Sequence, residues 1–402
     1  AAAEAVRAGV GDTVKLLKDV TESIEVPADA EMILDLNGFT LTNTDKKHTI
    51  VNYGTLTIKD SGGNGTVDNV SHAKAAVFNE GTLSLESGTL TRSAENGASP
   101  SDNGGNSYYV AENRGVMKVS GGTITADGKY SSLIANKPVA GSEVSLTITG
   151  GVLSNGFITV KNEDGCSFEI SGGTITSGEQ AVQNWGSAKI SGGTLNGPVI
   201  GWSYDDVPSE TVISGQAVIH GDVKAVNYMN ASSAPVITIT GGTIYGTLSK
   251  GTHDGSSGIK VDAEDSTASV IQVSGGSFSN QVAEAFCAPG FVPTGELVDG
   301  MYTVRSETEE PEQPEQPGEP EQPEKPEQPG DGTGDSGETG GGGSGSGGGS
   351  HSGSGSGSSA QTVSPASTGD ETNLVLPASI LLLAVCGLGI CVAVSVRKKS
   401  AK

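Results

Sequence analysis

Short runs in which apolar and polar residues alternate recur between residues 10 and 278, and most of them contain the same Gly-Gly step. In each run a strand with period-two apolar residues leads into Ser or Thr, two glycines and a second short strand. The clearest copies are residues 117–124, 146–153, 168–175, 188–195, 237–244 and 271–278. One such unit cannot bury its apolar face alone, so we expect neighbouring copies to stack on one another.

The spacing between copies predicts a parallel β-helix. Measured at the apolar residue two places before the first glycine, Ile148, Ile170, Ile190 and Ile213 are 22, 20 and 23 residues apart. This spacing suits one turn of such a solenoid, and longer steps are the same turn with an inserted loop. We therefore expect an all-β parallel β-helix of about ten coils over residues 10–278. A helical cap at 1–9 and a closing cap at 279–305 would cover its two ends, the closing cap with Phe286, Phe291 and Tyr302.

A second register supports the stack. Asn52, Asn79, Asn113 and Asn184 each lie six residues before the apolar position of the following copy, and a glycine follows each of them two residues later. Asparagines at one position of stacked strands form amide ladders, and Asn tolerates the left-handed conformation of a turn. We expect these four side chains to form one ladder. The alternative is four independent Asn-x-Gly turns.

The composition changes sharply near Ser306. Pro-Glu-Gln-Pro units run from Pro311 to Pro329, and residues 330–359 are almost entirely Gly and Ser. Regular proline imposes an extended polyproline II spacer, and neither stretch can form a core. Residues 306–363 are therefore expected to be a disordered stalk. Much of the formal net charge of −24 comes from this acidic region, and no basic stripe indicates nucleic-acid binding.

The chain ends with an apolar run over residues 374–396 that carries no charge and is followed by Arg397, Lys398 and Lys399. At about 1.5 Å per residue a helix of this length crosses a bilayer and leaves its basic end in the cytoplasm. We expect a helix in the plasma membrane here, with everything before it outside the cell. The start Ala1-Ala2-Ala3 is what removal of a signal peptide would leave.

Residues 364–402 resemble a sortase sorting signal of the LPxTG type, in which a Pro and Thr-Gly motif precedes an apolar helix and a basic end. Here Pro365, Thr368 and Gly369 carry the motif. The resemblance implies cleavage after Thr368 by a sortase and attachment to peptidoglycan. Two departures stand out: Ser364 replaces the leucine, and two residues instead of one separate Pro365 from Thr368.

The repeats, including Asp35-Leu36-Asn37-Gly38, resemble the right-handed β-helix regions of surface proteins from gut Firmicutes, which are usually regarded as adhesin-like. This resemblance implies right-handed coils and the cell wall or membrane-anchored surface of a Gram-positive bacterium. It says little about a ligand, because a fold alone does not give a function.

Catalysis is an alternative, because β-helices of the pectate-lyase type act on polysaccharides. Asp205 and Asp206, beside Trp202 and Tyr204, would be the acid and base on a sugar. The competing interpretation is a solvated loop between coils. By resemblance, such lyases use calcium-binding acids and a basic residue. We find no acidic cluster beside either arginine of the repeats, at positions 92 and 114.

Aromatic residues are few, but five fall in consecutive coils. If aligned along one face they would bind a carbohydrate or peptide; otherwise they cover the bases of inserted loops. They are Trp185, Trp202, Tyr204, Tyr228 and Tyr245. No metal site or cofactor is expected, because the histidines share no ligand spacing and the cysteines are sparse. The histidines considered, which we expect at the surface, are His48, His72, His220 and His253.

Together these patterns favour a non-enzymatic, wall-attached surface protein. Its rigid solenoid would present an adhesive surface to glycans or proteins of a host or a neighbouring cell. Its other partners would be sortase, peptidoglycan and the plasma membrane. Two alternatives stay open: a wall-displayed polysaccharide lyase or glycoside hydrolase, and a passive surface coat or spacer.

Overall fold

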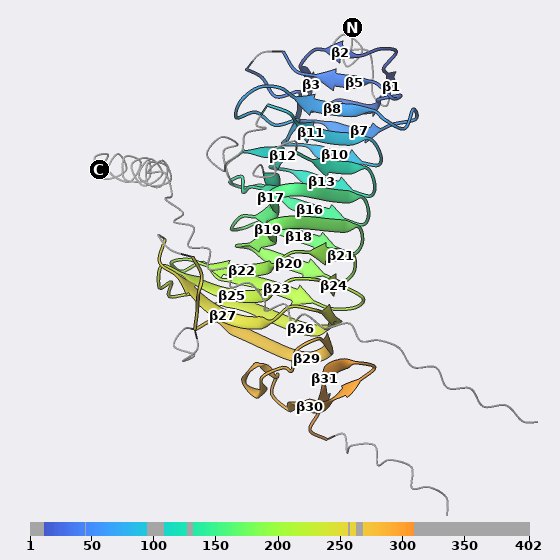
Figure 1. Cartoon of the computed structure of the whole chain (residues 1–402). Coiled ribbons are helices and arrows are strands. Elements are labelled where there is room, and N and C mark those ends of the chain that lie inside the picture. Colours follow the sequence, from blue (N-terminus) through green and yellow to red (C-terminus); the bar gives the residue numbers. More distant parts are fainter. Residues whose placement is uncertain are drawn as a thin grey trace, which may run out of the picture. The chain divides into compact units, whose positions relative to one another are not determined.

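The computed structural model describes residues 12–44, 46–94, 108–126, 132–255, 258–262 and 268–308. They form an all-β parallel solenoid of about nine turns (Figure 1). This number is close to the ten coils that the sequence predicts. The expected N-terminal cap, the stalk beyond residue 308 and the transmembrane and sorting segments all lie outside the described residues.

The strands stack in three columns, each paired in parallel register from turn to turn. Column A precedes the Gly-Gly step. It contains β1 (Asp12–Lys15), β4 (Glu31–Asp35), β7 (Thr55–Lys59), β10 (Thr82–Leu85), β13 (Val116–Val119), β16 (Ser145–Ile148), β18 (Ser167–Ile170), β20 (Ser187–Ile190), β23 (Ser209–Ile213) and the first halves of β26 (Pro235–Ile244) and β29 (Val270–Phe278).

Column B follows the Gly-Gly step. It contains β2 (Val20–Thr21), β5 (Thr40–Thr42), β8 (Thr66–Asn69), β11 (Thr89–Arg92), β14 (Thr123–Thr125), the starts of β17 (Val152–Asn162) and β19 (Thr174–Asn184), then β21 (Thr194–Asn196), β24 (Val218–Ile219) and the ends of β26 and β29.

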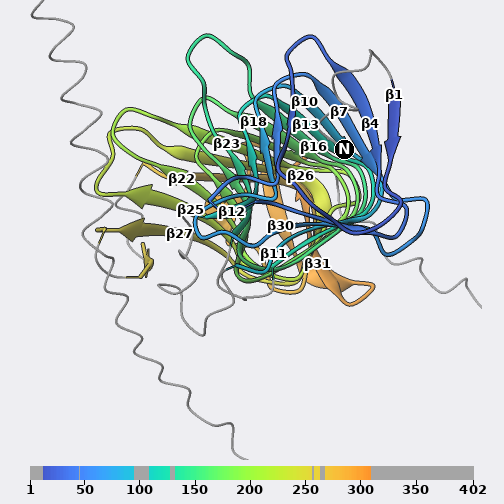
Figure 2. The same ribbon diagram turned by 90° about the horizontal axis from the view of Figure 1, so that it is seen from above.

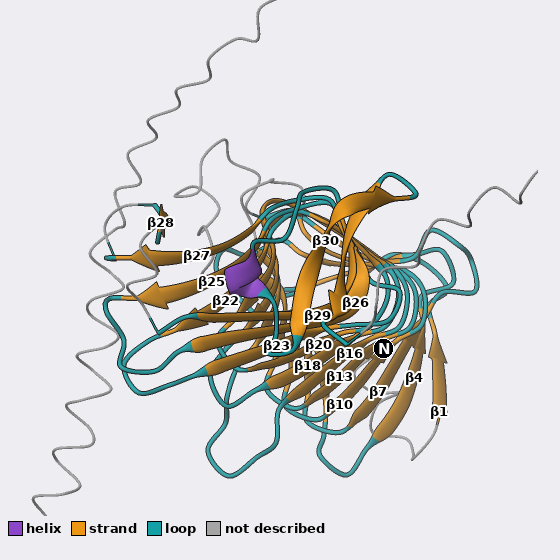
Figure 3. Cartoon of the chain, turned by 90° about the horizontal axis from the view of Figure 1, so that it is seen from below, coloured by secondary structure: helices purple, strands orange, loops and turns teal. Residues whose placement is uncertain are grey.

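Column C closes each turn. It contains β3 (Ile24–Val26), β6 (Ile50–Asn52), β9 (Val77–Asn79), β12 (Tyr109–Asn113), β15 (Ser132–Asn136), the ends of β17 and β19, then β22 (Val199–Ser203), β25 (Val223–Tyr228) and β27 (Leu248–His253). The short β28 (Lys260–Val261) pairs with β27 in antiparallel fashion. Figures 2 and 3 show β22, β25 and β27 projecting to one side of the stack.

The core is a set of apolar rows that run along the solenoid. On column A, Ile148, Ile170 and Ile190 lie in register and are fully buried. On column B, Ile175 and Leu195 continue a similar row. Burying one such side chain stabilises the fold by about 1.5–3 kcal/mol. An isolated turn could not bury these side chains, because the turns above and below it provide the apolar surface that covers them. The stack is therefore what makes each repeat stable.

The Gly-Gly step forms the corner between columns A and B, and its two glycines meet different demands. A Cβ on Gly172 would lie 2.3 Å from the carbonyl oxygen of Thr149 in the preceding turn, so no side chain fits there. Gly173 has φ +87°, a conformation that costs other residues about 1–2 kcal/mol. The motif thus reflects close stacking at its first glycine and a left-handed turn at its second.

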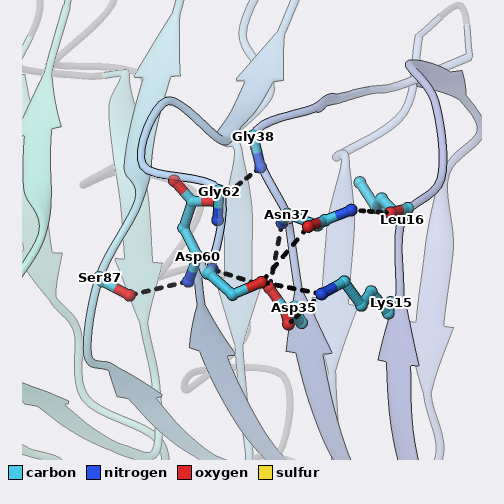
Figure 4. A network of polar contacts seen from close by, with 9 residues as sticks. Lys15, Leu16, Asp35, Asn37, Gly38, Asp60, Gly62 and Ser87 are labelled. Carbon is cyan, nitrogen blue, oxygen red and sulfur yellow. Dashed lines mark hydrogen bonds and ion pairs between the residues drawn. The ribbon is translucent and has the colours of Figure 1, made fainter.

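In the first turns carboxylates stabilise the corner (Figure 4). Asp60 accepts hydrogen bonds from the backbone N–H groups of Gly38 at 2.7 Å, Gly62 at 3.1 Å and Gly65 at 2.6 Å. Burial by itself would raise the pKa of Asp60, but the N–H donors outweigh it, and the pKa lies below its usual value. Asp35, beside Lys15, accepts in a similar way from the backbone N–H of Asn37 in its own corner and of Ser61 in the next corner.

The C-terminal end of the solenoid departs from the parallel pattern. A 3₁₀ turn, η1 (Glu284–Phe286), precedes a hairpin of β30 (Phe291–Val298) and β31 (Met301–Ser306), and β31 pairs antiparallel with the end of β29. Phe286 and Tyr302 pack against the core. Phe291 begins β30 opposite Ser306. The last turn is thereby covered by a different structure (Figure 1).

Candidate binding face

Six asparagines at the ends of successive column C strands form a buried row of side-chain amides. The Nδ2 of each of the first five donates to the Oδ1 of the asparagine one turn further on, at N···O distances of 2.6 to 2.9 Å. The row is Asn52, Asn79, Asn113, Asn136, Asn162 and Asn184. Asn113 Nδ2 also donates to the carbonyls of Gly115 and Ser145, so the amide holds the turn that leads into column A.

The structure thus places the four asparagines selected from the sequence in one row and adds Asn136 and Asn162. The six-residue spacing missed these two because longer loops follow them, so that they lie 12 and 8 residues before Ile148 and Ile170. A different signal marks them. Each has a buried aliphatic residue two places before it, Ile134 or Val160, as expected at the end of an inward-facing strand.

The row has two unlike ends. Asn52 Oδ1 is buried and has no hydrogen-bond partner among the described residues; Val26 lies opposite it in the preceding turn. At the other end Asn184 Nδ2 donates to Thr211 Oγ1 at 3.0 Å. Gly201 occupies the next position in register, so the amide row stops there.

Where the asparagines stop, the column C strands become longer on their outer side. In earlier turns the chain leaves the column at the asparagine, and two residues separate Asn52 from the column A strand that begins at Thr55. After Gly201, β22 continues to Ser203 and β25 continues to Tyr228. This extension contains Trp202 and Tyr228, and the strands β22 and β25 project to one side of the solenoid (Figures 2 and 3).

Four of the five candidate aromatic residues gather around this extension, and one of them, Trp185, packs against it from the turn before. Trp185 stacks on Trp202 with ring centroids 5.2 Å apart, and Tyr204 and Tyr228 each meet Trp185 edge-on at 5.7 Å. His253 joins them, stacked on Tyr228 at 5.3 Å. Trp202 is only 4% exposed, whereas Tyr204 is 37% exposed. Most of these rings bury one another in a second apolar cluster, and Tyr204 is the ring offered to solvent.

Two residues of the cluster region differ from expectation. Tyr245 lies apart from the other four aromatic residues and stacks instead on His220, at 4.6 Å, beyond the ends of column B strands. His253, expected to be an ordinary surface residue, is partly buried in the cluster, and burial lowers its pKa. The register of β25 and β27, which places Tyr228 opposite His253, creates this contact.

A shallow depression adjoins Tyr204 just beyond the ends of the column C strands. Its lining residues are Arg114, Lys137, Pro138, Glu163, Asp164 and Tyr204. Glu112 forms ion pairs with Arg114 at 2.7 Å and with Lys137 at 3.3 Å. Burial would raise the pKa of Glu112, but the two cations outweigh it and hold that pKa below its usual value. Arg114 and Asp164 are fifty residues apart in the sequence, but the stacked turns bring both of them to this depression.

Asp205 and Asp206 form a tight turn at the rim of this region. Val207 N donates to the carbonyl of Tyr204 at 2.9 Å, and Asp205 has a left-handed φ of 49°. The carbonyl of Asp205 accepts from Ser232 Oγ at 2.9 Å and from Ser233 N at 3.0 Å. Both carboxylates are exposed. They are therefore solvated carboxylates on a fixed turn.

Within residues 12–308, the described positions include no group of three or more His, Cys, Asp and Glu that could hold a metal ion. The part of the chain that the structure describes also contains no helix long and apolar enough to cross a membrane. The sortase motif around Pro365, Thr368 and Gly369 and the apolar segment 374–396 lie outside it.

Compared with known proteins, the chain matches no protein-family model, no curated protein and no solved structure.

Proposed function

We propose that this protein is a binding protein of a Gram-positive cell surface and that column C of its solenoid is the binding face. Its ligand would be a glycan or protein of a host or neighbouring cell. The expected sorting signal and apolar segment would hold residues 364–402 at the wall or membrane, and the stalk would extend the solenoid outward.

One observation carries the proposal: long aromatic and charged side chains converge at one place on column C. Tyr204, Arg114 and Asp164 come from three different turns and line one depression. The outer positions of the repeat elsewhere often carry small polar residues, as at Thr174 and Thr194 of column B. Exposed rings with nearby charges are typical of surfaces that bind ligands.

The rigidity of the stack supports the same proposal. The amide row holds column C in register from turn to turn, and hydrogen bonds from Ser232 and Ser233 hold the Asp205 turn. Side chains on such a scaffold lose little entropy when a ligand binds, which favours affinity.

The test is incubation of the purified full chain with a panel of plant glycans, mucin glycans and extracellular proteins, with binding and product release both measured. Binding without turnover, weakened by Tyr204→Ala, is the expected result. Product release that Asp205→Asn abolishes would instead assign the chain to the polysaccharide-degrading enzymes. The absence of both would favour a passive coat.

An enzyme remains the second candidate for a specific reason. Arg114 and Lys137 share the depression with Glu163 and Asp164, and a basic residue near acids is what abstraction of a sugar proton needs. Against it, Glu112 already pairs with both cations, and the depression is open and shallow.

A further inference from the structure

The charges around Tyr204 do not balance. Glu112 pairs with Arg114 and Lys137, and Glu163 pairs with Lys161 at 2.6 Å. Among the described residues, no ion pair involves Asp164, Asp205 or Asp206. The region thus has paired charges in the turns of Arg114 and Lys137, and three carboxylates without an ion pair in the later turns of Asp164 and Tyr204.

These carboxylates lie close enough to Tyr204 to act on its phenol. Burial raises the pKa of Tyr204, and the charges of Asp164, Asp205, Glu163 and Asp206 raise it further. Tyr204 is held edge-on by Trp185 and is still 37% exposed. An aromatic ring of fixed orientation beside carboxylates attracts a cation, both through its π-system and through charge-assisted hydrogen bonds.

The end of the depression in the earlier turns suits a different part of the same ligand. Arg114 and Lys137 both line the depression, and a single carboxylate pairs with the two of them. Guanidinium and ammonium groups carry several N–H donors and therefore retain some for backbone carbonyl oxygens. A polypeptide offers both features at once, a basic side chain and regularly spaced carbonyl acceptors.

Resting on the proposed binding function, we infer that the depression bounded by Tyr204, Asp164, Arg114 and Lys137 binds an extended polypeptide through a lysine or arginine side chain. The ammonium or guanidinium group lies at Tyr204 and Asp164. The backbone carbonyls of the peptide accept hydrogen bonds from Arg114 and Lys137.

The experiment measures binding of the full chain to four probes by isothermal titration: a lysine-glycine peptide, the same peptide with norleucine for lysine, a glucosamine tetramer and an N-acetylglucosamine tetramer. The lysine peptide is expected to bind at least tenfold more tightly than the norleucine peptide. Tyr204→Ala and Asp164→Asn should each weaken it roughly tenfold, and added salt should weaken it further.

Matched controls are Tyr245→Ala, an exposed ring beyond column B, and Asp299→Asn, a carboxylate in the β30–β31 turn; neither should change binding. Circular dichroism checks that each variant folds. Equal binding of the lysine and norleucine peptides, or no effect of Asp164→Asn, would overturn the inference. Preference for the glucosamine tetramer would also overturn it, by assigning the site to an amino sugar.

The two proposals fail in different ways. If a neutral glycan binds and Tyr204→Ala weakens it while the lysine peptide is ignored, column C remains the binding face and only the polypeptide ligand is wrong. If neither the panel of glycans and proteins nor any of the four probes binds, the proposed binding function falls as well.

Discussion

Replacing Asn113 by alanine removes the middle of the buried amide row. Its Nδ2 donates to Asn136 Oδ1 at 2.6 Å, to Gly115 O at 3.1 Å and to Ser145 O at 2.9 Å, and its Oδ1 accepts from Asn79 at 2.7 Å. A hydrogen bond contributes about 1 kcal/mol net, and a buried acceptor left unpaired costs about 1–3 kcal/mol.

Asn79 Nδ2 keeps two other acceptors, the carbonyls of Gly81 and Val116, so it loses only one of its three hydrogen bonds. The oxygen of Asn136 has no other donor within the described part of the chain. The free energy of the lost hydrogen bonds and the cost of leaving this oxygen unpaired add up. We therefore expect Asn113→Ala to lower the free energy of unfolding by roughly 4 kcal/mol.

Equilibrium urea denaturation of the full chain, followed by far-ultraviolet circular dichroism, measures the change. Asn196→Ala is the control, because Asn196 lies on the outside of column B and donates one hydrogen bond, to Thr176 Oγ1 at 3.1 Å. Its effect should stay within about 1 kcal/mol, the net contribution of that one hydrogen bond. If the Asn113 variant lost less than about 1 kcal/mol, or no more than the control, the amide row would not be stabilising the stack.

Two further predictions concern the corners. Gly172→Ala places a Cβ 2.3 Å from Thr149 O and should lower the free energy of unfolding by roughly 2 kcal/mol or more. Gly165 has φ +72° but open space around it, so Gly165→Ala should lower it by about 1 kcal/mol. Equal melting temperatures for the two variants would contradict this order. Asp60 has a lowered pKa in the folded protein, so its contribution is complete above its unfolded pKa of about 3.9 and is lost as the pH falls through the lower folded value. The stability gap between wild type and Asp60→Asn should therefore shrink below about pH 4, and a gap that stays constant in acid would refute the assignment.

The fold was predictable because its signals are local and repeated. The four residues Ser171-Gly172-Gly173-Thr174 are enough to predict the corner. Close stacking on the preceding turn requires the first glycine, and the left-handed backbone conformation requires the second. The spacing of Ile148, Ile170 and Ile190 then gives the turn length and the parallel pairing that the structure has.

The candidate site was predictable only in part, because it depends on which turns become neighbours. Arg114 and Asp164 line the same depression because their turns stack, and no short sequence motif indicates this neighbourhood. Tyr245 appeared to continue the row of aromatic residues, but it follows column B rather than column C. Gly201 takes the place of asparagine where β22 continues to Ser203, and the nearby turn signals, Gly197-Pro198 and Asp205-Asp206, lie outside that strand.

The most direct test of the account compares one substitution on each column of the full chain. Lys189→Glu changes column A, Thr194→Arg changes column B and Tyr204→Ala changes column C. For all three variants we measure binding to the glycan or protein of the panel that the wild-type chain binds. The account predicts that only Tyr204→Ala weakens binding; loss of binding in either of the other two, with Tyr204→Ala unchanged, would contradict it.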